Sequence, residues 1–433
     1  MSIKEIRPDY DQPNYDPAKI APYTLEDPLE FLSGKKVSTQ EEWLLRRKEI
    51  LSIFAKEMFG EEPPLPEALV TELIEEKEGA LAGFAVRSQY RMWFKADKSG
   101  PFLDFLVLRP RFVREKARPI LFLNYRGNHQ IIPDEEVVIP EGMWSRCMPG
   151  HQVPPERGVV CNPNEDFVVP AGLLLSAGFA IVTCCYCQIS PDPNWNEPEE
   201  RFQQDNFAYT KLFELWGKRD ESRTDNITAL GAWAWVLSRA LDLAERIPEL
   251  DAANNIVTGF SRLGKAALIA AARDERFQIC FPVQCGGGGA TLAKRDFGEN
   301  VATEVQMFRH WYCRAYDKYA KNPAELLHFD QHLLLAAIAP RRVLLAGFDD
   351  EWFDTEGEYL ACKAASPAWE FCGKAPFPAV PYPDDFETSA IGPDLGYYRR
   401  SQGHGIADFD WLMLLRFAEN SGAGTEKKAD KTV

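Results

Sequence analysis

Five short apolar runs, separated by stretches of helical periodicity, constrain the fold of this chain more than any other feature. The runs are rich in Val, Ile, Leu and Phe and cover residues 119–125, 179–186, 256–260, 279–283 and 342–348. Between and after them, apolar residues recur every third or fourth position over residues 226–246, 263–273, 333–338, 356–371 and 408–419, which predicts helices. Strands that are apolar on both faces and alternate with helices are typical of a mainly parallel sheet covered on both sides. We therefore expect an α/β fold.

The chain shows no internal repeat and no linker rich in Gly, Pro or Ser that would divide it. Residues 1–36 predict an irregular N-terminal arm, and Ser38 with Glu41 forms a capping-box pattern that predicts a helix from there to about residue 59. Strand-like runs follow at about 83–94 and 102–109. We expect one domain over residues 37–420 and a disordered tail over 421–433.

Two long polar segments, residues 133–166 and 190–218, follow expected strands of the sheet. Ligands of open α/β sheets bind at the ends of such strands, so both loops are predicted to border a binding cleft. Trp144 and Trp195 in these loops are available to stack on a sugar ring.

Charge and composition exclude several classes of partner. The net charge is −16 over 433 residues, and the acidic residues are spread along the chain. Nucleic acids and anionic membranes require a basic face, so neither is expected as a partner. No apolar run approaches the roughly 20 residues needed to cross a bilayer, and the N-terminus lacks a hydrophobic signal segment. From these features the chain is either cytoplasmic or shown without its signal peptide.

The densest group among the ten cysteines is Cys184, Cys185 and Cys187, inside the apolar run 179–187. Metal sites usually pair Cys or His at loop spacing, whereas a free thiol in a buried strand behaves as a small hydrophobic side chain. We expect core packing here, and no metal or cofactor is predicted.

The strongest chemical signal is the segment Val257-Thr-Gly-Phe-Ser-Arg-Leu-Gly-Lys, in which a strand passes through Gly259 and Ser261 into a helix. This is the strand–turn–helix context of a nucleophile elbow, in which the turn exposes the serine hydroxyl and aims backbone N–H groups at an oxyanion. The match is imperfect, because Leu263 occupies the usual position of the second glycine and Gly264 follows one residue later. A serine at such a position can also be an ordinary N-cap.

A nucleophilic serine needs a base and an acid, and both have candidates later in the chain. His404 lies in a Gly-flanked loop before the last expected helix, where the histidine of an α/β-hydrolase belongs. Asp349 and Asp350 directly follow the expected strand at 342–348, the usual position of the acid. His332 opens a helix and is expected to be structural.

At these residues the chain resembles the glucuronoyl esterases of carbohydrate esterase family 15, especially their bacterial branch. The resemblance runs from about residue 14 to residue 417, and the serine motif of that family, G-x-S-R-x-G-K, accounts for the displaced second glycine. Further matching segments are Asn-Tyr-Arg-Gly-Asn-His at 124–129, the Trp-rich helix at 233–242, residues 329–341, Asp-Glu-Trp-Phe-Asp at 350–354, and Gly-Glu at 357–358. The resemblance implies an α/β-hydrolase fold with long active-site loops.

The same resemblance implies the activity and the roles of the site residues. The family hydrolyses esters between the carboxyl group of 4-O-methyl-glucuronic acid on xylan and lignin alcohols. Ser261 would be the nucleophile, His404 the base, and Arg262 part of the oxyanion site. The residues implied to contact the uronic acid ring are Lys265, Glu299 and Trp352.

One departure from the family pattern concerns the acid. Many members carry it as Glu after the next strand, where this chain has Gln284. A neutral amide cannot offset the charge of an imidazolium, so we assign the acid to Asp350, as in some bacterial members. The neighbouring Cys285 is a weak alternative nucleophile, since no basic partner lies near it in sequence.

Two other functions stay open. The first is an esterase for acetylated xylan or other small carbohydrate esters, against which Arg262 and Lys265 argue because acetyl groups need no cations. The second is a non-catalytic glycan-binding relative, suggested by Gln284. Family resemblance implies a secreted or periplasmic protein, and the oligomeric state is left undetermined.

Overall fold

One mixed sheet organises the whole molecule in the computed structural model, which describes residues 3–113, 115–139, 157–158, 168–192, 211–383, 390–401 and 403–419. Among these residues the sheet has nine strands in the order β1-β2-β3-β5-β4-β6-β7-β8-β9. The strands are β1 (Val70–Ala80), β2 (Ala85–Trp93), β3 (Phe102–Pro110), β4 (Arg118–Asn124), β5 (Phe179–Cys185), β6 (Ile256–Phe260), β7 (Ile279–Val283), β8 (Arg342–Phe348) and β9 (Leu395–Arg400).

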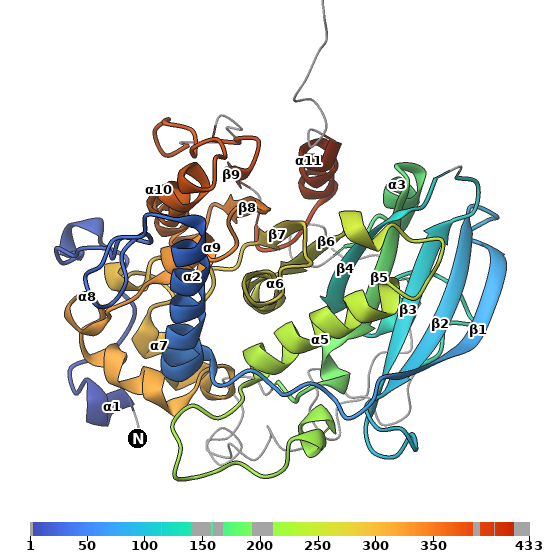
Figure 1. Cartoon of the computed structure of the whole chain (residues 1–433), viewed down its shortest axis with the longest axis horizontal. Helices are drawn as coiled ribbons and strands as arrows, with labels where there is room; N and C mark the ends of the chain where they lie inside the picture. The colour runs from blue at the N-terminus through green and yellow to red at the C-terminus, as the bar shows by residue number, and fades with distance from the viewer. Residues whose placement is uncertain are drawn as a thin grey trace, which may run out of the picture.

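The two halves of the sheet differ in direction. β1, β2, β3 and β5 pair antiparallel, whereas β5, β4, β6, β7, β8 and β9 are mutually parallel. The parallel strands are almost fully buried because helices cover both faces, which explains why their sequences are apolar throughout. In Figure 1, α5 (Ala229–Ala244) and α6 (Arg262–Arg273) lie on one side of the sheet, and α3 (Ala171–Ser176) and α11 (Asp408–Glu419) lie on the other.

Each face of the sheet carries its own hydrophobic core. The larger core gathers side chains of α2 (Gln40–Phe54), α5, α6, α9 (Gln331–Ala336) and α10 (Thr355–Phe371). The smaller core lies under α3 and α11 and includes Leu174 and Trp411. This is the α/β-hydrolase architecture expected from the sequence. The parallel strands β4 to β8 and the main helices match the expected runs within a few residues.

Two strands escaped the sequence analysis. β1 is rich in Glu and only partly buried, and β9 has the sequence Leu-Gly-Tyr-Tyr-Arg-Arg. β1 is an edge strand, so its exposed face carries charge instead of the apolar pattern of a central strand. β9 is largely buried, and its Tyr and Arg residues concealed that burial in the sequence.

The capping box of α2 was also predicted one residue too early. Thr39, not Ser38, is the N-cap, and its hydroxyl accepts a hydrogen bond from Glu42 N at 3.2 Å. Glu42 in turn accepts from Ser38 N at 2.8 Å. The reciprocal pattern is present, but Glu42 and not Glu41 completes it.

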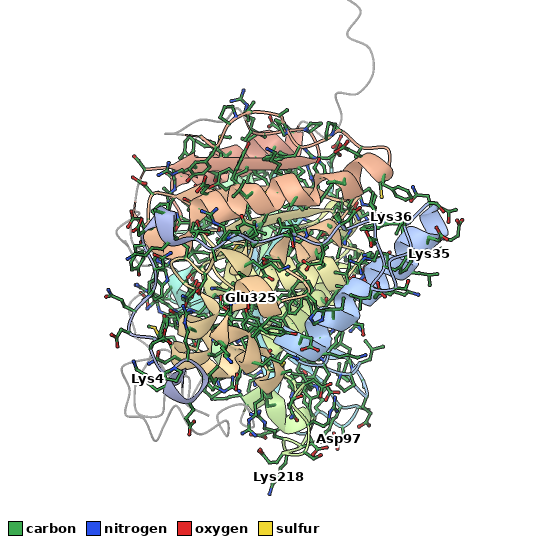
Figure 2. All side chains as sticks on the ribbon, turned by 90° about the vertical axis from the view of Figure 1, so that its left-hand side faces the viewer. Lys4, Lys35, Lys36, Asp97, Lys218 and Glu325 are labelled. Carbon is green, nitrogen blue, oxygen red and sulfur yellow. The ribbon has the colours of Figure 1, made fainter. Side chains whose placement is uncertain are left out.

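Charged side chains of both signs are spread over the surface. Figure 2 shows Lys4, Lys218, Asp97 and the neighbouring Lys35 and Lys36 around the outline of the molecule, and Glu325 in the middle of the face turned to the viewer. No helix in the described part of the chain is long and apolar enough to cross a membrane.

The N-terminal arm is less irregular and better anchored than its composition suggests. It contains the short helix α1 (Ile3–Ile6), and Tyr10 is buried. Arg7 forms an ion pair of 3.0 Å with Asp296, and Asn14 O accepts a hydrogen bond from Gly298 N at 2.9 Å. The division into arm, domain and tail stays a prediction, and residues 420–433 lie outside the described part of the chain.

Candidate active site

Ser261 occupies the sharp turn between β6 and α6. Its backbone has φ 55° and ψ −127°, a conformation that a residue with a side chain rarely adopts and that costs on the order of 1–3 kcal/mol. Its side chain makes no capping hydrogen bond to α6, although the residue stands at the N-cap position. The alternative interpretation of Ser261 as an ordinary helix cap is therefore wrong, because its hydroxyl is not used to cap α6.

Two glycines make this turn possible. A Cβ at Gly259 would come within 2.1 Å of Leu263 O, so no other residue fits there. A Cβ at Gly264 would lie 3.0 Å from Gly259 O and 3.1 Å from Val283 O, where α6 packs against β6 and β7. The displaced second glycine thus serves close packing of the helix, one residue later than in the usual motif.

His404 lies beside this turn in a cage of aromatic rings. Its ring centroid is 4.5 Å from that of Phe260, 4.9 Å from Phe353 and 5.6 Å from Phe348. Its Nε2 is buried and has no hydrogen-bond partner among the described residues. Burial, together with the positive charges of Arg262 and Arg400, lowers the pKa of His404 to about 4. The imidazole is therefore neutral at neutral pH, as a general base must be.

The loop of His404 is held by the residue at which many family members carry the acid. Gln284 is buried after β7, has φ 50°, and its Oε1 accepts a hydrogen bond from Gly405 N at 3.0 Å. Gln284 therefore fixes the backbone next to the base, although it carries no charge.

The structure does not bring Asp350 to His404. Asp350 is exposed, and its Oδ1 accepts a hydrogen bond from Trp352 N at 2.9 Å. The preceding Asp349 forms an ion pair with Arg399. No hydrogen bond or ion pair joins His404 to a carboxylate, or to Ser261, in the described ranges. The expected contact between Asp350 and His404 is thus missing here, because a local cap at the start of a short helical turn engages the carboxylate instead.

A third carboxylate, besides Asp349 and Asp350 after β8, lies close to the loop that follows β7. Glu358 on α10 is fully buried, and its Oε1 accepts a hydrogen bond from Gly286 N at 3.0 Å. Burial raises the pKa of Glu358 to about 8. In the sequence, Gly357-Glu358 is only one of the segments that match the family, whereas in the structure Glu358 anchors the Gly-rich loop after β7.

Arg262, at the first position of α6, is tied to Asp192. The two form an ion pair in which the Asp192 carboxylate is fully buried and the Arg262 side chain is 24% exposed. Burial alone would lower the pKa of Arg262, but Asp192 outweighs it and raises that pKa. Sequence reasoning missed Asp192, since a single acidic residue in a long polar loop gives no signal of its own.

Lys265, Glu299 and the backbone of Trp352 lie in mutual contact, while their expected role against a uronic acid ring stays a prediction. Lys265 and Glu299 are both buried, with Nζ 2.8 Å from the Glu299 carboxylate, and Nζ also donates to Gly287 O. Glu299 N donates to Trp352 O at 2.6 Å. Burial raises the pKa of Glu299 despite the opposing effect of Lys265. The structure thus places a buried lysine–carboxylate pair one helical turn beyond Ser261.

Tyr125 is a further site residue that the sequence analysis quoted without assigning a role. It follows β4, its ring lies 6.1 Å from that of Phe260, and its hydroxyl donates to Phe260 O and interacts with Ser261. Burial raises the pKa of Tyr125, so this hydroxyl stays protonated at neutral pH and keeps its hydrogen bond to Phe260 O beside Ser261.

The cysteines divide into two kinds. Cys184, Cys185 and Cys285 are buried free thiols, and burial raises the pKa of each, which makes Cys285 a poor nucleophile. Cys187 is disulfide-bonded, so the expectation of a free core thiol is wrong for this residue. No group of three His, Cys, Asp or Glu side chains in the described part of the chain could hold a metal ion.

A strained serine between a parallel strand and a helix, with a neutral histidine from a late loop beside it, defines an α/β-hydrolase of the serine type. A family model described as glucuronyl esterase, fungi, matches residues 196–373. The chain is 32% identical over 432 residues to carbohydrate esterase MZ0003 from an unknown prokaryotic organism, a match that covers 96% of this chain and 94% of that protein.

Solved structures agree with the sequence comparisons. A glucuronoyl esterase from Solibacter usitatus superposes with a TM-score of 0.81 at 31% identity, over 93% of this chain and 99% of that one. A promiscuous CE15 esterase from a marine bacterial metagenome gives a TM-score of 0.81 at 30% identity, over 94% of this chain and 100% of that one. The chain belongs to the glucuronoyl esterases of carbohydrate esterase family 15, and it is a carboxylic ester hydrolase.

Proposed function

We propose that this esterase cleaves the ester between the carboxyl group of (4-O-methyl-)glucuronic acid on glucuronoxylan and a lignin alcohol. The observation that carries the proposal is the cluster of Arg262, Lys265 and Glu299 next to Ser261. A polyhydroxylated uronic acid needs charged and polar partners in this position, whereas an acetyl group offers nothing for a buried lysine–carboxylate pair to bind. Trp352, next to Glu299, supplies an aromatic side chain for the sugar ring.

In the proposed reaction Ser261 Oγ attacks the ester carbonyl while His404 accepts the hydroxyl proton. The carbonyl oxygen becomes an oxyanion, which Arg262 and the backbone N–H groups at the start of α6 stabilise. The tetrahedral intermediate collapses, the lignin alcohol leaves with the proton held by His404, and the glucuronoyl group stays on Ser261. Water, deprotonated by His404, then attacks this acyl-enzyme. The bond to Ser261 Oγ breaks, His404 returns the proton to Oγ, and glucuronate is released.

Asp350 remains the proposed partner of the imidazolium formed during these steps. It lies between Phe348 and Phe353 in sequence, and both of their rings contact His404. Its carboxylate would have to exchange the hydrogen bond from Trp352 N for one from His404. Asp350 is favoured over Asp349 because Asp349 is already paired with Arg399.

Hydrolysis of benzyl glucuronate and of acetylated xylan, each by the wild-type protein and by Ser261→Ala, tests the proposal. We expect the wild type to hydrolyse the glucuronate ester. In Ser261→Ala, kcat should fall on the order of a million-fold, while the melting temperature should stay unchanged. Preference for acetylated xylan would instead indicate an acetylxylan esterase. Binding of the glycan without turnover by the wild type would indicate a non-catalytic relative.

We further propose that the protein works in an oxidising compartment, as a secreted or periplasmic enzyme. The disulfide bond of Cys187 supports this, since structural disulfides persist mainly outside the reducing cytosol. A polymeric plant substrate, which does not enter cells, requires the same location.

A further inference from the structure

Asp192 is a buried carboxylate on which four hydrogen-bond donors converge. It follows β5 at the end of the described segment 168–192 and is 1% exposed. Its Oδ1 accepts from His310 Nε2 at 2.8 Å and from Trp311 Nε1 at 2.9 Å. Its Oδ2 accepts from the Tyr186 hydroxyl at 3.1 Å and from Arg262 Nη1. Four donors saturate the lone pairs of a carboxylate, so its position is fixed.

The charge of Asp192 is maintained in spite of its burial. Desolvation alone would raise the pKa of this carboxyl, but Arg262, His310 and Trp311 hold it below the usual range. The group is thus ionised throughout the range in which the enzyme can work. A buried anion in contact with Arg262 gives that guanidinium a permanent and oriented counter-ion.

The same carboxylate also holds the indole ring of Trp311, which lies against the charged groups of Arg262 and Lys265. Trp311 is 2% exposed, and its indole N–H is held by Asp192. The Arg262 guanidinium lies 5.0 Å from the centroid of this ring, and Lys265 Nζ lies 5.4 Å from it. Both distances are within the range of cation–π attraction.

Arg262 keeps donors that Asp192 does not use. Its Nε is buried and has no partner among the described residues, and Asp192 engages Nη1. The guanidinium is planar and rigid, so fixing one nitrogen sets the direction of the others. An unengaged donor one residue from Ser261 is suited to an oxyanion that forms during the reaction.

We propose that Asp192 is a positioning residue for ester hydrolysis. Its ion pair with Nη1 fixes the orientation of the Arg262 guanidinium, so that the remaining N–H groups of Arg262 face the oxyanion. Asp192 touches no substrate and acts through Arg262, directly and through Trp311. The inference rests on the proposed oxyanion role of Arg262.

A double-mutant cycle tests this mechanism with benzyl glucuronate as substrate. Asp192→Asn keeps the size of the side chain but removes its charge. We expect it to lower kcat by about 10²-fold with little change in KM, since misplacing a catalytic group by about 1 Å costs that much. In an Arg262→Ala background, which itself lowers kcat, the same change should cause almost no further loss.

Asp330→Asn is the matched control for burial. Asp330 is also 1% exposed and accepts backbone N–H groups of Ala293, Lys294 and Gln331 at 2.7, 3.0 and 2.7 Å. The Asp330→Asn variant should unfold at a lower denaturant concentration than the wild type, while its folded fraction should keep the wild-type kcat. If Asp192→Asn does not fold, Trp311→Phe removes one donor to Asp192 and keeps an aromatic ring. That variant should lower kcat roughly tenfold, the equivalent of about one net hydrogen bond, and only when Arg262 is present.

Three outcomes overturn the inference in distinguishable ways. If Arg262→Ala retains full kcat, the oxyanion role of Arg262 fails and the role of Asp192 fails with it. If Arg262→Ala is impaired but Asp192→Asn is not, only the positioning role is wrong. If the two losses multiply in the double variant, Asp192 acts independently of Arg262 and is merely structural.

Discussion

At the scale of single residues, the chemistry depends on side chains in unfavourable surroundings. Ser261 has a strained backbone, and His404 is surrounded by three phenylalanine rings and two arginine charges. Each feature is costly for folding and suits the proposed reaction, because it would expose the nucleophile and keep the base neutral.

The pH dependence of kcat/KM follows from the surroundings of His404. The folded protein lowers the pKa of His404 to about 4, below the usual value of about 6.5. A lowered pKa means that the base stays neutral as the pH falls, until the pH approaches 4. We therefore expect kcat/KM to be flat between pH 7 and about 5 and to halve near pH 4. An acid limb near pH 6.5 would show that a carboxylate contacts His404 in the free enzyme.

Asp350→Asn should lower kcat by roughly 10⁴-fold, by analogy with the loss of the acid in serine proteases. Asp349→Asn, the matched control, should change kcat little, because Asp349 is more than half exposed and is paired with Arg399. Gln284→Glu should remain folded and active. An oxygen can still accept the hydrogen bond from Gly405 N, and the amide nitrogen that is lost has no partner among the described residues. Full activity of Asp350→Asn would show that another group supports the imidazolium.

At the scale of elements, the N-terminal arm supports the segment that carries Glu299. Tyr10 is buried, with its hydroxyl bonded to Asn300 and Thr303, and two further contacts tie Arg7 to Asp296 and Asn14 to Gly298. These contacts flank Glu299 on both sides. The Pro-rich and polar sequence of the arm would suggest a loosely attached surface segment. Its contacts instead anchor the residues on both sides of Glu299.

Deletion of residues 1–15 should raise the KM for benzyl glucuronate more than it lowers kcat. The reason is that Glu299 would lose its flanking anchors while Ser261 and His404 keep theirs. The double variant Arg7→Ala with Tyr10→Phe should show the same direction with a smaller effect, and it serves if the deletion destabilises the protein. Steady-state kinetics and thermal melting check both, and an unchanged KM in the folded deletion variant would contradict the role of the arm.

At the scale of the whole molecule, one sheet with a core on each face joins distant parts of the chain. The site itself is assembled from β4, β5, β6, β7 and β8 ends and from the loop before α11. These strands are parallel, so their carboxyl ends meet at one edge, where open α/β sheets bind their ligands.

The disulfide of Cys187 is expected to contribute to global stability. Its reduction should lower the free energy of unfolding by about 2–4 kcal/mol, because it releases a constraint on the unfolded chain. Urea unfolding with and without a reductant measures this. A Cys187→Ser variant that is insensitive to the reductant confirms the origin of the effect, whereas equal stability of the oxidised and reduced protein would contradict it.

Much of this protein was determined by local sequence. The apolar runs at β6, β7 and β8 were predicted to the residue. The strand–turn–helix pattern and the order in the chain also singled out Ser261 and His404 as candidates, and the structure places them at neighbouring positions. These features depend on burial and on backbone geometry, which leave periodic apolar residues and obligatory glycines in the sequence.

Only the tertiary structure decided which charged groups meet. Asp192, from a loop 70 residues before Arg262, and Glu358, under the loop after β7, could not be distinguished from other acidic residues by their sequence neighbours. The same holds for Asp350, which was expected at His404 and instead caps Trp352 N. The sequence shows the same residue type whether a carboxylate is solvated or buried. The partner of the carboxylate is set by how distant strands and loops pack. The physical reason is that electrostatic pairing acts over a few ångströms in space and leaves no periodic pattern along the chain.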